Sequence, residues 1–142
     1  NICRFYNVYG PHQLTEGEYC TVIGIFERQY INGEPLTITW DGDQRRDFTH
    51  VNDIVDGLVL TSETKSWGLS IELGRGKNYS INELANMFGE DYAREYIDKK
   101  PGEVRSTLCD IGTAYSTIGY DPKHNLNDYV QSIKMDQLTP LV

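Results

Sequence analysis

Basic residues are scarce in this sequence, and the shortage limits the partners that the chain can have. Only 13 of the 142 residues are Lys or Arg, against 21 Asp and Glu, so the formal charge is −8 at pH 7. Nucleic acids and anionic membranes attract proteins through basic surfaces. The composition therefore argues against nucleic acid and against a membrane as partners. No apolar run approaches the roughly 20 residues that a membrane-spanning helix needs.

Cysteine is also rare. The chain has three, Cys3, Cys20 and Cys109, and they are widely spaced. An odd number at such spacing fits neither a disulfide framework nor a zinc site. We therefore expect reduced thiols, a cytoplasmic location and no bound metal, since the three histidines are equally scattered.

Strand-like and helix-like segments alternate along the chain. Residues 1–8, 36–40, 48–51, 67–73 and 95–98 are rich in β-branched and aromatic residues or follow turn signals, which predicts strands. Helical spacing predicts a helix over 18–31, with Tyr19 on its apolar face and Asn32-Gly33 as its stop. A second helix should run from 52 onward, capped by Asn52 or Asp53, and a third over 80–88, with a Ser80–Glu83 capping box. Two more are predicted over 110–118 and 126–138. This alternation indicates the α/β class. In the second helix, Ile54, Val55, Leu58 and Val59 should form the buried face.

The segment 40–57 holds the densest group of chemically useful side chains. Asp41-Gly42 predicts a tight turn, and Arg45 and Arg46 follow it. Two guanidiniums so placed can form a clamp for phosphate or carboxylate, with Asp47 holding one of them. The alternative is a surface Arg–Asp pair in water, which would contribute little.

The same segment resembles a known family. GDQRRDFTHVNDIVDG (42–57) is similar to the G-x-Q-x-R-D-[FY]-x-[HY]-V-x-D segment of the extended short-chain dehydrogenase/reductases, which include the nucleotide-sugar epimerases and dehydratases. RFYNVYGP (4–11), GLSIELGRG (68–76), KKPGE (99–103) and GYDP (119–122) resemble further segments of that family in the same order. The resemblance spans nearly the whole chain.

The resemblance implies a particular part of the family fold. Residues 1–142 would be the C-terminal, substrate-binding portion, with 1–10 and 67–74 as two strands of a Rossmann sheet and the rest as a small α/β domain. The other strands would lie upstream of residue 1. We therefore expect a fragment or one half of a split protein, and strands that need cover.

Two patterns that the family's redox chemistry requires are missing. A Rossmann fingerprint needs three glycines between a strand and a helix; Gly74-x-Gly76 lacks the third and is expected to be a plain turn. None of the ten tyrosines has a Lys four residues later, so the family's Y-x-x-x-K pair is absent too. NAD belongs to the complete family enzyme, and we expect this chain alone to be inactive and to bind no NAD tightly.

Substrate recognition is what the resemblance leaves to this chain. It implies that Asn7 lies near the phosphates and that Arg46 binds the pyrophosphate. It also implies that Lys100 and Glu103 contact phosphate and ribose, although Lys100 replaces the family's usual Arg. Asn7 could instead simply end a strand, and Arg46 could belong to a surface pair.

The resemblance also implies contacts with the base and with the cofactor. Thr37 and Thr39 lie on the strand that flanks the base in the family, and Phe5 and Val8 match positions that pack on the nicotinamide end of the cofactor. Core packing is the alternative for Phe5 and Val8.

The predicted function is the nucleotide-sugar-binding part of an NAD-dependent epimerase or dehydratase. A free-standing nucleotide-sugar-binding module, or a structural subunit that completes a separately encoded Rossmann half, are the alternatives. A homo-oligomer is expected.

Overall fold

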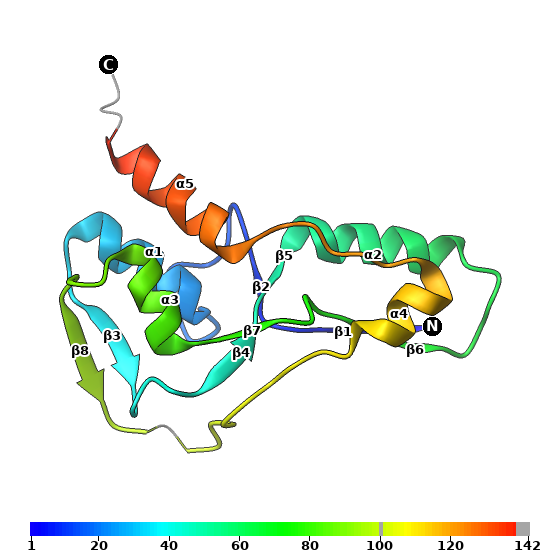
Figure 1. Cartoon of the computed structure of the whole chain (residues 1–142), viewed down its shortest axis with the longest axis horizontal. Helices are drawn as coiled ribbons and strands as arrows, with labels where there is room; N and C mark the ends of the chain where they lie inside the picture. The colour runs from blue at the N-terminus through cyan, green and yellow to red at the C-terminus, as the bar shows by residue number, and fades with distance from the viewer. Residues whose placement is uncertain (100, 139–142) are drawn as a thin grey trace.

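The computed structural model describes residues 1–99 and 101–138, which form eight strands and five helices (Figure 1). In chain order these are β1 (Ile2–Phe5), β2 (Val8–Tyr9), α1 (Val22–Asn32), β3 (Leu36–Thr39), β4 (Arg45–Asp47), β5 (Thr49–His50), α2 (Val51–Glu63), β6 (Ser70–Leu73), β7 (Asn78–Ser80), α3 (Ile81–Phe88), β8 (Arg94–Ile97), α4 (Ile111–Ile118) and α5 (Leu126–Leu138). The prediction of an α/β fold is confirmed.

The strands associate in pairs that are distant in sequence. β1 lies parallel to β6, β2 to β5, and β3 to β8, whereas β4 and β7 are antiparallel. Parallel pairing requires a crossover, which the intervening helices supply. Each strand from the first third of the chain therefore pairs with a strand that lies later in the sequence.

The first predicted strand, 1–8, is interrupted. Asn7 has a φ of 23°, which breaks the extended backbone between β1 and β2. The two halves then join different partners, because Phe5 pairs with Leu73 while Val8 pairs with Thr49. The range 1–10 is therefore two short strands, and Asn7 is the step between two sheets.

The first helix is shorter than predicted. It begins at Val22 because the Thr21 hydroxyl accepts a hydrogen bond from the Gly24 N–H, which caps the N-terminus. Tyr19, expected on the buried face, precedes the helix and is 84% exposed. The C-terminal stop is as predicted, since Gly33 adopts φ 69°.

The strand predicted at 48–51 also differs. The structure forms β4 and β5 around Phe48, and α2 begins directly at Val51. His50 is its N-cap, with Nδ1 accepting from the Asn52 N–H at 3.2 Å. The expected caps, Asn52 and Asp53, lie inside the first turn instead.

Two hydrophobic cores lie at opposite ends of the molecule (Figure 1). The larger core is built from α1, β3, α3 and α5 and from the segments near β2 and β5. Its buried residues are Tyr9, Ile23, Phe26, Leu36, Ile38, Phe48, Ile81, Leu84, Ala85, Phe88, Leu126, Val130 and Ile133. The smaller core lies between β1, β6, α2 and α4. Its buried residues are Ile54, Ile71, Leu73, Ala114 and Tyr120.

Helix α2 buries less of its apolar face than the sequence predicts. Ile54 is buried, but Val55, Leu58 and Val59 are each more than 40% exposed. The helix packs on the β1–β6 pair through Ile54 and Gly57, and Gly57 is required because a Cβ there would meet Leu73 at 2.7 Å. The part of the α2 surface that carries Val55, Leu58 and Val59 is therefore largely uncovered.

Candidate functional site

A pocket of about 270 Å³ lies beside the N-terminus of α1, next to β3 and β4. Its lining residues are Asn7, Cys20, Thr21, Val22, Ile25, Thr37, Thr39, Gln44, Arg46, Phe48, Ile81, Ile97 and Glu103. All but one of the six residues predicted to bind substrate are among them. The exception, Lys100, lies outside the described residues.

Arg46 is the pocket's cation. Its side chain is only 15% exposed, and Nη1 donates to the Arg45 carbonyl at 2.9 Å. Nη2 lies 3.7 Å from Glu103 Oε1, longer than the 2.7–2.9 Å of a charge-assisted hydrogen bond. The guanidinium therefore keeps donors available for an incoming anion.

Arg45 points to the other side of β4, so the predicted two-arginine clamp is wrong. Its Nε donates to Asn78 Oδ1 at 2.9 Å, and Nη2 lies 2.8 Å from Glu83 Oε2. Successive side chains of a strand face opposite sides, which separates the two guanidiniums. Arg45 thereby ties β4 to β7 and to the cap of α3.

Asp47 does not hold an arginine either. It is fully buried, and its carboxylate accepts the backbone N–H groups of Arg75, Gly76 and Cys109 at 2.8, 2.9 and 3.0 Å. The turn at Gly74-x-Gly76 is thus filled by a carboxylate of the same chain. The N–H groups of Arg75 and Gly76 are therefore already occupied, and the prediction that this loop binds no cofactor stays a prediction.

Two neutral residues of the pocket, Asn7 and Thr37, form hydrogen bonds with other residues of the protein. Asn7 Nδ2 donates to the Asp47 carbonyl at 3.1 Å and to Thr107 Oγ1 at 3.4 Å. Thr37 Oγ1 accepts from the amide of Gln29 at 2.7 Å. Asn7 therefore anchors the step between the strands as well as lining the pocket.

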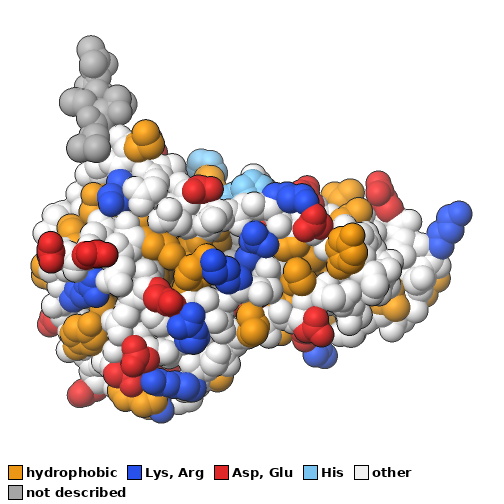
Figure 2. Space-filling model, in the orientation of Figure 1, with side chains coloured by type: hydrophobic (Ala, Val, Ile, Leu, Met, Phe, Trp, Pro, Cys, Tyr) orange, Lys and Arg blue, Asp and Glu red, His pale blue; other side chains and the backbone are white. Residues whose placement is uncertain are grey.

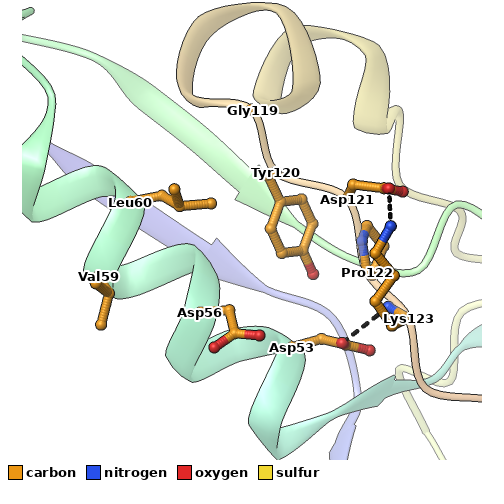
Figure 3. A pocket seen from close by; sticks show the side chains of 9 residues that line it. All are labelled: Asp53, Asp56, Val59, Leu60, Gly119, Tyr120, Asp121, Pro122 and Lys123. Atoms are coloured by element: carbon orange, nitrogen blue, oxygen red, sulfur yellow. Dashed lines mark hydrogen bonds and ion pairs between the residues drawn. The ribbon is translucent and has the colours of Figure 1, made fainter.

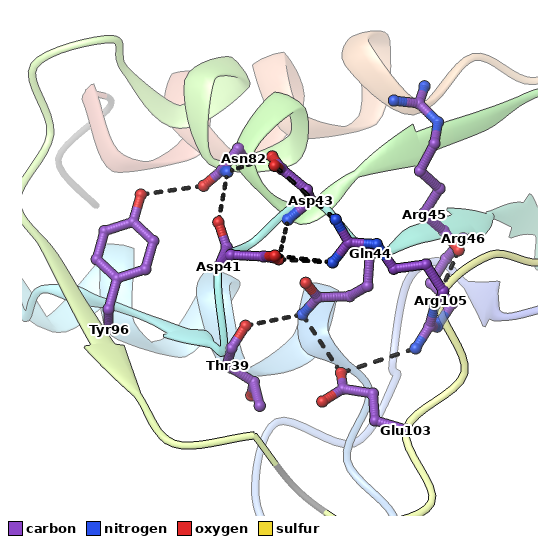
Figure 4. Close-up of polar contacts among 10 residues, drawn as sticks. All are labelled: Thr39, Asp41, Asp43, Gln44, Arg45, Arg46, Asn82, Tyr96, Glu103 and Arg105. Atoms are coloured by element: carbon purple, nitrogen blue, oxygen red, sulfur yellow. Dashed lines mark hydrogen bonds and ion pairs between the residues drawn. The ribbon is translucent and has the colours of Figure 1, made fainter.

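Glu103 enters the pocket from the loop after β8, opposite Arg46 (Figure 4). Gln44 joins it to β3, because Gln44 Nε2 donates to the Thr39 carbonyl at 2.9 Å and to Glu103 Oε1 at 3.3 Å. Sequence reasoning missed Gln44 as a pocket residue. The signal was present, since Gln44 and Arg46 are two residues apart and therefore share a face of an extended segment.

Phe5 and Val8, the predicted cofactor contacts, lie outside this pocket. Phe5 is 50% exposed at the end of β1, and Val8 packs against the smaller core. The packing of Val8 fits the alternative of core packing, and the exposed ring of Phe5 is accessible to another group. The predicted cofactor contacts of both residues stay predictions.

A second cavity, of about 490 Å³, separates α2 from residues 119–123 (Figure 3). Asp53 at its edge accepts from the backbone N–H groups of Lys123 and His124, and its Oδ1 lies 2.8 Å from His124 Nδ1. Burial opposes ionisation of Asp53, but these hydrogen bonds outweigh it and lower its pKa. A carboxylate held this firmly is structural.

The thiols of Cys109 and of Cys20, which lines the first pocket, are not activated. Burial raises the pKa of Cys109 to about 12, with the Asp47 carboxylate adding to the effect, and burial also raises the pKa of Cys20. A nucleophilic cysteine needs the opposite shift. Neither cysteine is a candidate nucleophile.

Residues 1–99 and 101–138 contain no group of three or more His, Cys, Asp or Glu side chains placed to hold a metal ion. Over the same residues, no helix is both long and apolar enough to cross a membrane. Figure 2 shows acidic and basic side chains interspersed on one face, with apolar side chains between them.

Comparison with known proteins identifies relatives of this arrangement. The chain is 31% identical over 132 residues to an uncharacterized UDP-glucose epimerase, YtcB, of Bacillus subtilis, and 28% identical over 131 residues to dTDP-L-rhamnose 4-epimerase of Burkholderia thailandensis. Each alignment covers 89% of this chain but only 40% and 36% of the relative. The chain thus spans about two-fifths of the length of these curated relatives.

Solved structures agree. UDP-glucuronic acid 4-epimerase from Bacillus cereus, in complex with UDP-glucuronic acid and NAD, superposes with a TM-score of 0.84 at 31% identity, covering 94% of this chain and 45% of that one. UDP-glucose 4-epimerase from Thermotoga maritima, solved with UDP-glucose, gives 0.86 at 28% identity, with 96% and 46% covered. The chain therefore has the fold of the corresponding part of a Rossmann-type epimerase.

The family model for the NAD dependent epimerase/dehydratase family matches residues 1–74, just over half of the chain. These residues include β1 to β6 and carry Arg46 and Gln44. The chain therefore belongs to the NAD-dependent epimerase/dehydratase family.

Proposed function

We propose that this chain is the nucleotide-sugar-binding part of an NAD-dependent epimerase or dehydratase, and that the Arg46 pocket holds the nucleotide diphosphate. One observation carries the proposal. The pocket brings a poorly exposed guanidinium together with Asn7, Thr37, Thr39 and Glu103, in a chain whose relatives include enzymes named for UDP- and dTDP-sugars.

The roles follow from the chemistry of the side chains. Arg46 would bind a pyrophosphate oxygen, because its planar fork of donors matches phosphate geometry. Glu103 would accept hydroxyl groups of the ribose. Its Oε2 is buried and has no hydrogen-bond partner in the described part of the chain, so a ligand hydroxyl there would satisfy an otherwise unpaired acceptor.

Thr37, Thr39 and Asn7 would shape the rest of the pocket. Thr37 and Thr39 lie on β3, where we place the base, and Asn7, which also lines the pocket, would contact the phosphates. Lys100, three residues before Glu103 in the sequence, is proposed as a further phosphate contact. A volume of about 270 Å³ suits part of a nucleotide-sugar, and the sugar would extend beyond it.

The redox half of the reaction would lie elsewhere in the complete enzyme. A bound NAD would supply the hydride-transfer chemistry there. The loop at Gly74-x-Gly76 does not fit NAD's pyrophosphate, because its N–H groups already donate to Asp47. We therefore propose that the chain alone is inactive and contributes at most Phe5 and Val8 to the cofactor's nicotinamide end.

The smaller core favours a partner for this chain. Ile2 and Phe5 on β1 and Val55 and Val59 on α2 are all exposed apolar residues around that core. Exposed apolar surface of this kind recruits protein. We propose either a homo-oligomer or a separately encoded Rossmann half as the partner. The rarity of cysteine supports a cytoplasmic location.

Calorimetric titration of the purified chain tests the proposal. UDP should bind measurably and UMP more weakly, because only UDP supplies a pyrophosphate to Arg46. NAD should show no sub-micromolar binding. A chain that gives no heat with millimolar UDP, or that binds UMP as tightly as UDP, would contradict the assignment of this pocket.

A further inference from the structure

Gln44 is one of the few fully buried polar side chains of the protein, at 1% exposure. Its amide nitrogen contacts two acceptors, the Thr39 carbonyl at 2.9 Å and Glu103 Oε1 at 3.3 Å. A flipped amide would place its oxygen against both acceptors, so the partners themselves fix the orientation. Gln44 is therefore a donor bridge between β3 and the loop that carries Glu103 (Figure 4).

Glu103 depends on contacts of this kind because it lies in no helix or strand. The loop is held at its far side by backbone bonds, with the Arg45 N–H donating to the Arg105 carbonyl at 2.8 Å and the Thr107 N–H donating to the Arg45 carbonyl at 3.1 Å. These bonds fix the chain beyond Glu103. They leave the rotation of the carboxylate to Gln44 and to the longer contact with Arg46.

The two oxygens of Glu103 are consequently unequal. Oε1 is held by Gln44 and faces Arg46, whereas Oε2 is buried and has no hydrogen-bond partner among residues 1–99 and 101–138. A buried carboxylate oxygen without a donor is costly, and a ligand hydroxyl would remove that cost. Glu103 itself lines the pocket that contains Arg46.

We propose that Gln44 is a positioning residue that turns Glu103 so that Oε2 meets the ribose hydroxyls of a nucleoside diphosphate. The proposal rests on the proposed function, and it assigns to Gln44 a part in recognising the sugar hydroxyls that neither the motif nor the relatives' names give it. Gln44 does not touch the ligand in this account. It acts through Glu103 alone.

The test compares two ligands in two proteins. UDP and its 2′,3′-dideoxy analogue differ only in the hydroxyls that Glu103 would accept. In the unmodified chain, the analogue should bind roughly ten- to a hundredfold more weakly, the range for a hydrogen bond to a charged group. In Gln44→Met, which keeps the length of the side chain but removes the donor, that ratio should fall to within about threefold.

The affinity for the dideoxy analogue separates positioning from a merely structural role. It should change by less than about threefold, since Gln44→Met keeps the length of this pocket-lining side chain and leaves Arg46 in place. Equal weakening of both ligands in Gln44→Met, or an unchanged ratio, would overturn the proposal while leaving the proposed function intact. An unmodified chain that binds no UDP would overturn both.

Gln44→Leu provides a second variant, which removes both polar groups of the amide. Leucine cannot donate to Glu103, so this variant should lose the discrimination between UDP and its analogue as well. Circular dichroism checks that each variant is folded. If neither variant folds, Gln44 serves the fold alone and the proposal is wrong.

Discussion

The two hydrophobic cores of this protein differ in completeness. Among the described residues, the larger core is enclosed by α1, α3 and α5 and contains thirteen buried residues, whereas the smaller contains five, beneath a helix whose outer apolar residues are exposed. The proposed nucleotide pocket adjoins the larger core. The more enclosed of the two cores is thus the one beside the proposed pocket.

Asp47 joins the two regions, and replacing it should have the largest effect. In Asp47→Asn, an amide nitrogen would face one or more of the three backbone N–H groups that the carboxylate now accepts. We expect a loss of about 3–5 kcal/mol in the free energy of unfolding, because at least one buried N–H group loses its acceptor and the remaining hydrogen bonds no longer involve a charged group. Urea unfolding measures the loss.

The control for this change is Asp56→Asn, on the exposed surface of α2. It makes the same chemical substitution and should change stability by less than about 0.5 kcal/mol. Equal stability of the two variants would show that Asp47 does not tie the regions together.

A matched pair of core truncations sharpens the comparison. Leu84 in the larger core and Leu73 in the smaller are both fully buried. Leu84→Ala should cost about 3–4 kcal/mol and Leu73→Ala about 2–3, because the open side of the smaller core can relax into the cavity. Urea denaturation of both variants checks the order. A larger cost at Leu73 would mean that the smaller core is the more tightly packed of the two.

His50 lies at the start of α2, between the regions, and should make stability depend on pH. Burial lowers its pKa below the usual 6.5, and the neighbouring His124 adds to this, while Asp53 opposes it. The unfolded chain therefore binds a proton more readily, so stability is lost as pH falls from about 6.5 through the folded pKa. Protonation also removes the Nδ1 acceptor that caps the helix.

Thermal unfolding between pH 7.5 and pH 5.5 measures this effect. The cap contributes about 0.5–2 kcal/mol, so a fall of roughly that size is expected. His50→Asn keeps a capping acceptor and does not titrate, so its stability should vary less over the same range. An identical pH dependence in both proteins would assign the effect to other groups.

The exposed face of α2 should affect assembly more than stability. Val55→Lys combined with Val59→Lys places charge on this uncovered surface and should change the free energy of unfolding by less than about 0.5 kcal/mol. Sedimentation should shift toward the monomer, because charge there disfavours a covering partner. Ser62→Lys, also exposed on α2, is the control and should leave assembly unchanged. An unmodified chain that is already a single monomeric species would refute the expected homo-oligomer.

Local signals predicted much of the fold. The Ser80 capping box with Glu83 forms as expected, with bonds of 2.6 and 3.0 Å, and Gly33 ends α1. These features depend on residues within one turn of each other. The strand at 95–98 is displaced by a single residue.

What the sequence did not reveal depends on distant partners. Arg45 and Arg46 look equivalent in sequence, but the pairing of β4 with β7 determines which one faces the pocket. Gln44 gains its role from Glu103, 59 residues away. The exposure of Val55 and Val59 could not be foreseen either, because helical periodicity predicts an apolar face but not what covers it.

The neighbouring arginines of β4 provide the most direct test of the account. UDP binding is measured by calorimetry for Arg46→Ala and for Arg45→Ala, which removes the same side chain one residue earlier and on the other face. Arg46→Ala should weaken binding by roughly 1.5–3 kcal/mol, the scale of a hydrogen bond to a charged group, and Arg45→Ala by less than about 0.5. Unchanged binding in Arg46→Ala, or an equal loss in both variants, would contradict the claim that this pocket binds the nucleotide diphosphate through Arg46.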